Sequence, residues 1–210
     1  MNSSAHSPMF ITFEGLDFSG KSTQVALFAA KLTQTGRKNL VLRDPGGTAI
    51  GERIRSVLLD KEVLAMSDFT ELFLFSASRS QLVSEIIMPA LKQGTIVVCD
   101  RFFDSTTAYQ GAGRGLPLDE IATINHAAAG GLMPRITYFI DIPVAEVGRR
   151  MAQQKSGADR MEMNGVEFYE RVRNGFLRLA RKESRFEVID GLLGTEEIHD
   201  KVWRRFEREL

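Results

Sequence analysis

The sequence predicts an α/β fold built on a doubly wound, five-stranded parallel sheet flanked by helices. Short apolar runs alternate five times with longer amphipathic segments, which is the pattern of strand and helix in turn. Most of these runs are continuously apolar, as expected of strands that are covered on both faces. A glycine-rich turn joins the first strand to the first helix. In such folds ligands bind at the carboxyl ends of the strands.

The expected strands cover residues 9–14, 39–43, 95–100, 135–142 and 185–190. After the first strand, Val25, Phe28 and Leu32 fall at helical spacing, and Gly36 is a suitable stop. The same spacing returns over 82–90, where Pro89 should end or kink the helix. Further helices are expected over 117–129, 164–183 and 195–210.

Composition and charge narrow the function classes. The 210 residues favour one domain over 9–210, preceded by a disordered leader over 1–8. Lys and Arg together number 27, as do Asp and Glu, so no net charge draws the chain to nucleic acid or to an anionic membrane. We expect neither as a partner. The single cysteine, Cys99, excludes an internal disulfide and fits a cytoplasmic protein.

The turn after the first strand has the pattern of a phosphate-binding loop. Gly15 and Gly20 frame four residues, and Lys21 and Ser22 follow at the start of the expected helix. Backbone N–H groups would hold phosphate oxygens, Lys21 would reach the β and γ phosphates, and Ser22 would ligate Mg²⁺. The nucleotide-binding residues are therefore expected to be Gly15, Leu16, Asp17, Phe18, Ser19, Gly20, Lys21, Ser22 and Thr23.

This loop alone leaves a GTPase, an ATPase and a small-molecule kinase open. The base-reading Asn-Lys-x-Asp of regulatory GTPases is absent from the sequence. Asp100 and Arg101 leave the third strand together, where Asp100 can hold Mg²⁺ and Arg101 can bind a phosphate. A simple ion pair between these two residues is the alternative.

Four stretches resemble the thymidylate kinase family in their order and spacing: "FEGLDFSGKSTQ", "RDPGGT", "DRFFDSTTAYQG" and "DRMEMNGVEFYERVRNGF". The resemblance covers nearly the whole chain. It implies transfer of a phosphoryl group from ATP to dTMP, giving dTDP for dTTP synthesis. It also implies a P-loop kinase fold with a mobile lid, Mg²⁺ as the cofactor and a homodimer.

The resemblance assigns residues to the acceptor site. Phe75 and Arg79 are four apart on one expected helix and share a face, so the ring can stack on a pyrimidine while Arg79 donates to a base carbonyl. Without the resemblance, Phe75 in the core and Arg79 in solvent would be favoured. Tyr109 would lie against the sugar and favour deoxyribose. The implied substrate-binding residues are Asp17, Arg43, Pro45, Phe75, Arg79, Arg101, Thr106, Tyr109 and Gln110.

The phosphate loop has no basic residue between its glycines, whereas some members of the family place one there. By the resemblance, a lid over about 149–163 supplies the charge, with Arg160 as the first candidate and Lys155 as the second. A solvated helix face is the alternative for these charges. The expected catalytic residues are thus Lys21, Arg101, Arg160 and Lys155.

Some features depart from the family or point elsewhere. Phe18 is bulkier than the residue usual at its position, and Asp44 replaces a more usual glutamate. The segment 110–115, "QGAGRG", is expected to be a loop near the acceptor site. A kinase for UMP, CMP or AMP and a nucleotide-dependent switch with a degenerate site are the two rival functions.

Overall fold

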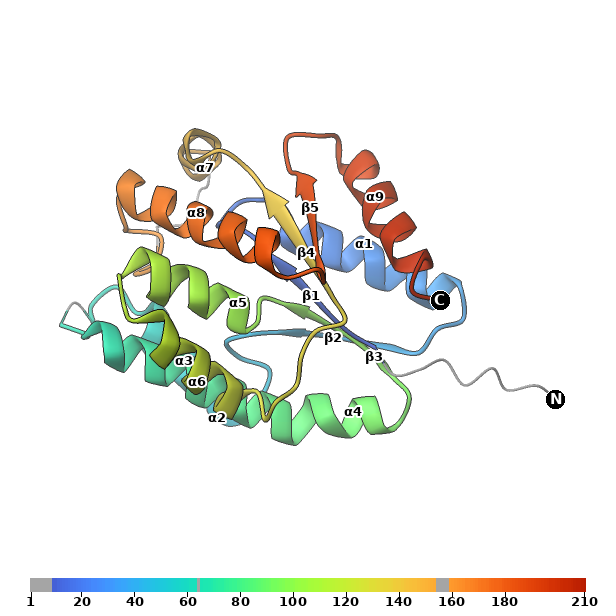
Figure 1. The fold of residues 1–210 in the computed structure, drawn as a ribbon, viewed down its shortest axis with the longest axis horizontal. Helices are drawn as coiled ribbons and strands as arrows, with labels where there is room; N and C mark the ends of the chain where they lie inside the picture. The colour runs from blue at the N-terminus through green and yellow to red at the C-terminus, as the bar shows by residue number, and fades with distance from the viewer. Residues whose placement is uncertain (1–8, 64, 154–158) are drawn as a thin grey trace.

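The computed structural model describes residues 9–63, 65–153 and 159–210, and its centre is the expected parallel sheet. The strands are β1 (Phe10–Glu14), β2 (Asn39–Arg43), β3 (Ile96–Asp100), β4 (Ile136–Asp141) and β5 (Phe186–Asp190). Their order is β2-β3-β1-β4-β5, with helices on both faces (Figure 1). Because β1 pairs with both β3 and β4, the chain changes winding direction at β1, and ligands bind at such a switch point.

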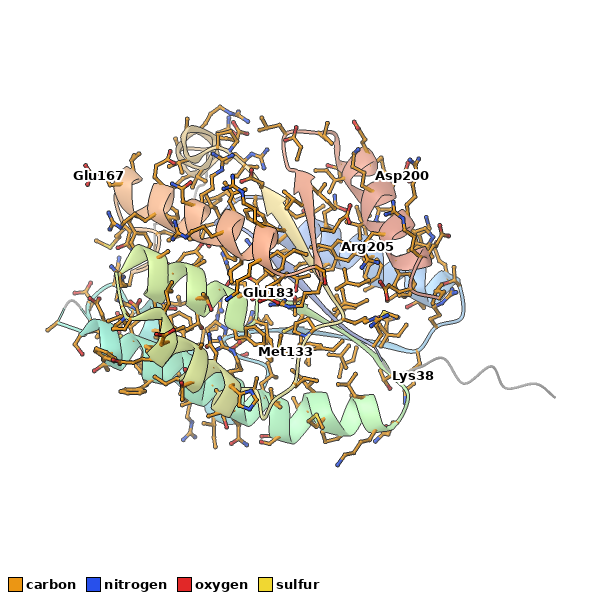
Figure 2. The ribbon with its side chains drawn as sticks, viewed as in Figure 1. Lys38, Met133, Glu167, Glu183, Asp200 and Arg205 are labelled. Atoms are coloured by element: carbon orange, nitrogen blue, oxygen red, sulfur yellow. The ribbon has the colours of Figure 1, made fainter. Side chains whose placement is uncertain are left out.

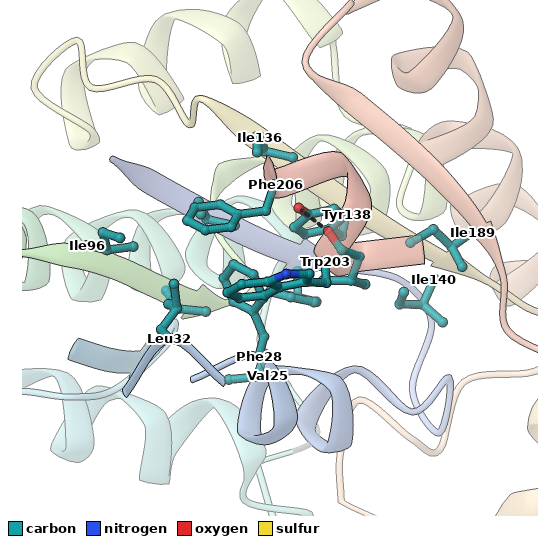
Figure 3. Packing of buried hydrophobic residues seen from close by; sticks show 14 of the residues in the cluster. Val25, Phe28, Leu32, Ile96, Ile136, Tyr138, Ile140, Ile189, Trp203 and Phe206 are labelled. Atoms are coloured by element: carbon teal, nitrogen blue, oxygen red, sulfur yellow. Dashed lines mark hydrogen bonds between the residues drawn. The ribbon is translucent and has the colours of Figure 1, made fainter. Parts of the chain in front are cut away.

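Successive side chains of the central strands enter different cores, because neighbouring residues of a strand point to opposite faces of the sheet. Tyr138 of β4 lies 4.9 Å from Phe13 between ring centroids, in the core beneath α1 (Lys21–Gln34) and α9 (Thr195–Glu207) (Figure 3). The next residue, Phe139, stacks at 5.0 Å on Phe176 of α8 (Val166–Lys182). Both faces of the three central strands are therefore covered, which explains their continuous apolar runs, whereas the edge strands β2 and β5 are partly exposed.

The remaining helices surround this frame. They are α2 (Ala49–Leu59), α3 (Asp68–Leu82), α4 (Met88–Lys92), α5 (Phe103–Thr106), α6 (Leu118–Ala128) and α7 (Val144–Met151), with π-helical segments η1 (Val83–Ile87) and η2 (Thr107–Gly113). The helices expected near 25–32, 117–129, 164–183 and 195–210 are confirmed. Helices α2 and α7 were not anticipated. Among the helices described, none combines the length and apolar character needed to cross a membrane.

Two local expectations need correction. Of the two outcomes expected at Pro89, an end of the helix is wrong, since the chain stays helical through Lys92. The wider turns of η1 come first, so Pro89 occupies the first turn of α4, where a missing N–H is tolerated. Segment 110–115 is not simply a loop, because η2 continues the helix of α5 through Gly113. That helix carries Tyr109 and Gln110 along the site.

Candidate functional site

The loop between β1 and α1 has the backbone geometry of an anion site. Gly15 has a φ of +148°, and a Cβ there would lie 2.5 Å from the Ile140 carbonyl oxygen. Gly20 precedes α1 with a φ of +92°, in the left-handed region, so it exposes the first N–H groups of the helix without a side-chain cap. The helix N-terminus therefore faces the loop with free donors and a partial positive charge.

Lys21 curls back over this loop. Its Nζ donates to the Leu16 carbonyl oxygen at 2.7 Å, and its side chain is buried. Burial, reinforced by the nearby charge of Arg101, lowers the pKa of Lys21 to about 8. An incoming phosphate would add negative charge beside Lys21 and raise its pKa again.

Ser22 and Asp100 meet where α1 begins and β3 ends. The Ser22 hydroxyl donates to Asp100 Oδ2 at 2.6 Å. These hard oxygen ligands suit Mg²⁺, which commonly takes one or two protein ligands and completes its shell with phosphate and water. Among the described residues no group of three or more His, Cys, Asp or Glu could hold a metal.

Arg101 ties the phosphate loop to the second pocket. Its φ of 68° lies in the left-handed region, unusual for an arginine, and aims the side chain back across β1. It donates to the Gly15 carbonyl oxygen at 2.8 Å and to Asp17 Oδ1 at 2.6 Å. Burial opposes ionisation of Asp17, but Arg101 and Lys21 outweigh it and hold the pKa of Asp17 below its usual value. A compact set of alternating charges results.

A cavity of about 100 Å³ opens beside Arg101. It is lined by eight of the nine expected acceptor residues: Asp17, Pro45, Phe75, Arg79, Arg101, Thr106, Tyr109 and Gln110. The other lining residues are Asp44, Arg55, Leu59, Ser105, Asp159 and Met161. The loop after β2, α2, α3 and the α5–η2 helix thus bring residues far apart in sequence to one pocket.

Arg79 is the most constrained side chain of this pocket. It is 1% exposed and donates to Asp44 Oδ2 at 2.6 Å and to Thr106 Oγ1 at 2.8 Å. Phe75, one turn earlier on α3, is half-buried and lines the same cavity. The alternative of a solvated Arg79 is therefore wrong.

The structure places Arg55, and not the expected Arg43, in the lining of the cavity. Arg43 is exposed, pairs with Glu52 at 2.8 Å and is outside the cavity lining described above. Arg55 of α2 lines the cavity and donates to the Pro45 carbonyl oxygen at 3.0 Å. The sequence reasoning missed Arg55 because it missed α2. A signal was available, since Thr48 caps that helix by accepting from the Gly51 N–H at 2.9 Å.

The basic residues of the expected lid take separate positions. Arg160 pairs with Glu71 at 2.7 Å and donates to the Leu58 carbonyl oxygen, so its charge is held beside α3. Arg150 of α7 reaches the phosphate loop and donates to the Phe18 carbonyl oxygen at 2.9 Å. Lys155 lies outside the described residues.

A second and larger cavity, of about 490 Å³, lies between α6 and the end of α8. Its lining includes Glu183 and Met133, which are labelled in Figure 2. Its lining includes none of the expected site residues. Because the phosphate loop and charge cluster adjoin the smaller cavity, size is a poor guide to the reaction site here.

Comparison with known proteins gives a consistent result. A model of the thymidylate kinase family matches residues 13–202. The thymidylate kinase of Kosmotoga olearia is 47% identical over 199 residues, covering 94% of this chain and 95% of that protein. The thymidylate kinase of Chlorobaculum parvum is 47% identical over 203 residues, with coverage of 92% and 93%. The crystal structure of the Ehrlichia chaffeensis thymidylate kinase matches with a TM-score of 0.76 at 35% identity, covering 94% and 98%.

Proposed function

The chain belongs to the thymidylate kinase family, and we propose that it transfers the γ-phosphoryl group of ATP to dTMP at the paired sites described above. The product is dTDP, a precursor of dTTP. The observation that carries this assignment is the cavity bearing Phe75, Arg79 and Tyr109, joined to the phosphate loop by Arg101. A donor site and an acceptor site that share one arginine suit phosphoryl transfer between two bound nucleotides.

The donor side uses residues 15–23. Backbone N–H groups and the start of α1 hold the β and γ phosphates, and Lys21 exchanges its contact with Leu16 for a phosphate oxygen. Ser22 and Asp100 would hold Mg²⁺. When bound, that cation neutralises charge that develops on the phosphates. Asp100 fits this role because its hydrogen bond to Ser22 brings the two oxygen ligands together.

The acceptor side reads base and sugar separately. Phe75 stacks on the pyrimidine, and Arg79 donates to its C4 carbonyl. The Tyr109 hydroxyl donates to Asp17 Oδ2 at 3.1 Å, which fixes the ring in the cavity wall. In this proposal the ring lies beside the sugar and disfavours a ribose 2′-hydroxyl. Arg101 and Arg55 bind the acceptor phosphate. Pro45, Thr106 and Gln110 complete the walls.

Transfer requires charge on the moving phosphoryl group and exclusion of water. We assign the segment 149–163 as a lid, and Arg160 as the residue that reaches the γ-phosphoryl when the lid closes. Arg160 must first leave Glu71. Replacing Arg160 with Ala should lower kcat at least tenfold with little change in the KM for dTMP, measured by steady-state kinetics. An unchanged kcat would remove Arg160 from the transfer step.

The assembly is a homodimer that packs α3 against its copy. Phe69 and Phe73 lie on one exposed face of α3, 38% and 54% exposed, with ring centroids 6.2 Å apart. Ile50 and Val57 of the adjacent α2 are also exposed. An apolar strip of this kind is typical of an interface.

A cytoplasmic location is supported by the free, buried Cys99.

A coupled ADP-release assay with Mg-ATP tests the assignment against its rivals. The acceptors dTMP, dUMP, UMP, CMP and AMP are compared in parallel. Preferred turnover of dTMP supports the acceptor pocket. Preference for another monophosphate would keep the kinase and overturn the acceptor assignment. ATP binding without turnover of any acceptor would favour the nucleotide-dependent switch.

A further inference from the structure

We propose that Asp44 and Asn125 are positioning residues that fix the Arg79 guanidinium, and that this fixed orientation selects a pyrimidine with a carbonyl at C4 over one with an amino group. The inference rests on the proposed function, because it takes Arg79 as the group that meets the base. It adds two residues that do not themselves need to touch the substrate, and it names the chemical distinction that they enforce.

Asp44 holds Arg79 from the loop after β2. The carboxylate and the guanidinium are almost fully buried, with side chains 0% and 1% exposed, and Asp44 Oδ2 accepts from Arg79 Nε at 2.6 Å. The backbone N–H of Asp44 donates to the Asp100 carbonyl oxygen at 3.0 Å, so the carboxylate is anchored to β3. The other carboxylate oxygen, Oδ1, is buried without a hydrogen-bond partner among the described residues. The carboxylate is thus directed at Arg79.

Asn125 holds Arg79 from the opposite side. Its Oδ1 accepts from Arg79 Nη1 at 3.2 Å, while its Nδ2 donates to the Phe103 carbonyl oxygen at 3.2 Å and to Thr107 Oγ1 at 3.1 Å. Asn125 is itself buried on α6 and also lines the larger cavity. It therefore joins α6 to the α5–η2 helix and to Arg79 in one contact set.

These contacts leave Arg79 a limited role. With the bond to Thr106 Oγ1, they use three of the five N–H groups of the guanidinium, one on each nitrogen. The two that remain can only donate. They suit the carbonyl at C4 of thymine or uracil, whereas the C4 amino group of cytosine presents a second donor. Because three elements hold the guanidinium, it cannot turn away from that mismatch without breaking buried hydrogen bonds.

The buried Arg79–Asp44 ion pair could also serve the fold alone, and its presence does not distinguish a structural role from a positioning role. The two roles differ at Asn125. A structural role depends on the donations from Nδ2 to Phe103 and Thr107, whereas the positioning role depends on Oδ1. Substitutions that separate the two ends of this one side chain therefore decide between them.

The first experiment compares Asn125→Ala with Asn125→Asp in the full-length enzyme. Asp keeps an acceptor for Arg79 but cannot donate to Phe103 or Thr107. We expect Asn125→Ala to raise the KM for dTMP about tenfold, the loss typical of a hydrogen bond to a charged group, with kcat and the KM for ATP within threefold. Asn125→Asp should stay within threefold of wild type for all three. Equal damage by both substitutions would overturn the positioning role.

The second experiment measures base selectivity. The ratio of kcat/KM for dTMP to that for dCMP should fall about tenfold in Asn125→Ala and in Asp44→Asn, mainly through the dTMP value. An unchanged ratio in both variants would overturn the selectivity, provided near-ultraviolet circular dichroism shows them folded. If Asp44→Asn does not fold, the Asn125 pair decides alone. Wild-type enzyme that does not prefer dTMP would instead refute the proposed function, so the two failures are distinguishable.

Discussion

Glu14 shows at the scale of one residue how the site constrains stability. It ends β1 fully buried, and its carboxyl group accepts from the Phe102 N–H at 2.8 Å and from the Ser105 hydroxyl at 2.6 Å. Burial, with the charge of Asp104, raises the pKa of Glu14 from 4.5 to about 8. Its protonated form is therefore the one that the folded state prefers at neutral pH.

The sign of the resulting pH dependence follows from linkage. The folded pKa exceeds the unfolded one, so this group's contribution is fully present below pH 4.5 and is lost as the pH rises through about 8. Glu14→Gln removes the titration but keeps an acceptor for Phe102. Across that range we expect the free energy of unfolding, measured in urea, to fall less steeply in the variant, by about 1 kcal/mol per pH unit. Parallel curves for the two proteins would contradict the shift.

Arg43 and Arg55 provide a matched pair for the acceptor phosphate. Arg55 is half-buried and lines the cavity, whereas Arg43 is exposed and engaged with Glu52. Arg55→Ala should raise the KM for dTMP about tenfold, as expected for a lost charged contact, and Arg43→Ala should change it less than twofold. Steady-state kinetics at fixed ATP measures both. A larger increase in the KM for dTMP in Arg43→Ala than in Arg55→Ala would instead assign the acceptor phosphate to Arg43.

The same pair marks how far the sequence could predict the site. The family resemblance placed eight residues that line the cavity, because its quoted motifs run through the phosphate loop, the loop after β2, and the segment from the end of β3 into η2, and because Phe75 and Arg79 share a face of α3. Arg55 was missed because α2 was not predicted, although its Thr48 cap could have indicated a helix. Arg43 followed the family pattern along the chain, but only the packing of α2 decides which arginine faces the cavity.

At the scale of elements, the contact between α8 and η2 depends on small side chains. A Cβ added to Gly175 would lie 2.8 Å from the Ala112 Cβ and 3.2 Å from the Ala108 Cα, neither of which can rotate away. Gly148 of α7 has nothing within 4 Å of its added Cβ. Both glycines lie in helices, so replacing each with Ala separates the effect of crowding, expected at Gly175, from the effect of backbone entropy, expected at both positions.

Gly175→Ala should lower the free energy of unfolding by about 1–3 kcal/mol through overpacking. It should also raise the KM for dTMP, because η2 carries Tyr109 and Gln110. Gly148→Ala should instead raise stability by about 0.5–1 kcal/mol, the gain from replacing a helical glycine. Urea unfolding measures both changes. If both substitutions changed the free energy of unfolding in the same direction, the close approach of α8 to η2 would not be what restricts residue 175 to glycine.

Element prediction succeeded where periodicity is strong and failed where local geometry interrupts it. The five strands and the long helices were predictable from apolar patterns alone. That the helix continues past Pro89 was not predictable, because the sequence shows the missing N–H but not the π-helical turns of η1 that precede it. Likewise the glycines of 111–115 suggested a loop, although two of them pack closely within or beside η2.

At the scale of the whole molecule, strand order turns scattered motifs into one site. The alternation of strands and helices predicts a parallel sheet, but the pairing of β1 with both β3 and β4 is a property of the packed chain. That pairing sets Asp100 opposite Phe13, so the end of β3 lies beside the phosphate loop. At the same scale, the exposed apolar face of α3 is where a second copy of the chain would pack in the proposed dimer.

Phe73→Asp tests the proposed dimer. A charge placed at the centre of an α3 contact would have to be buried unpaired, so the variant should be monomeric where the wild type is dimeric in analytical ultracentrifugation. The wild type's melting temperature should also rise with protein concentration, whereas that of the variant should not. Met133→Asp is the control, since Met133 is 52% exposed in the segment before β4, and it should leave the mass unchanged. A monomeric wild type, or a dimeric Phe73→Asp, would rule out α3 as the interface.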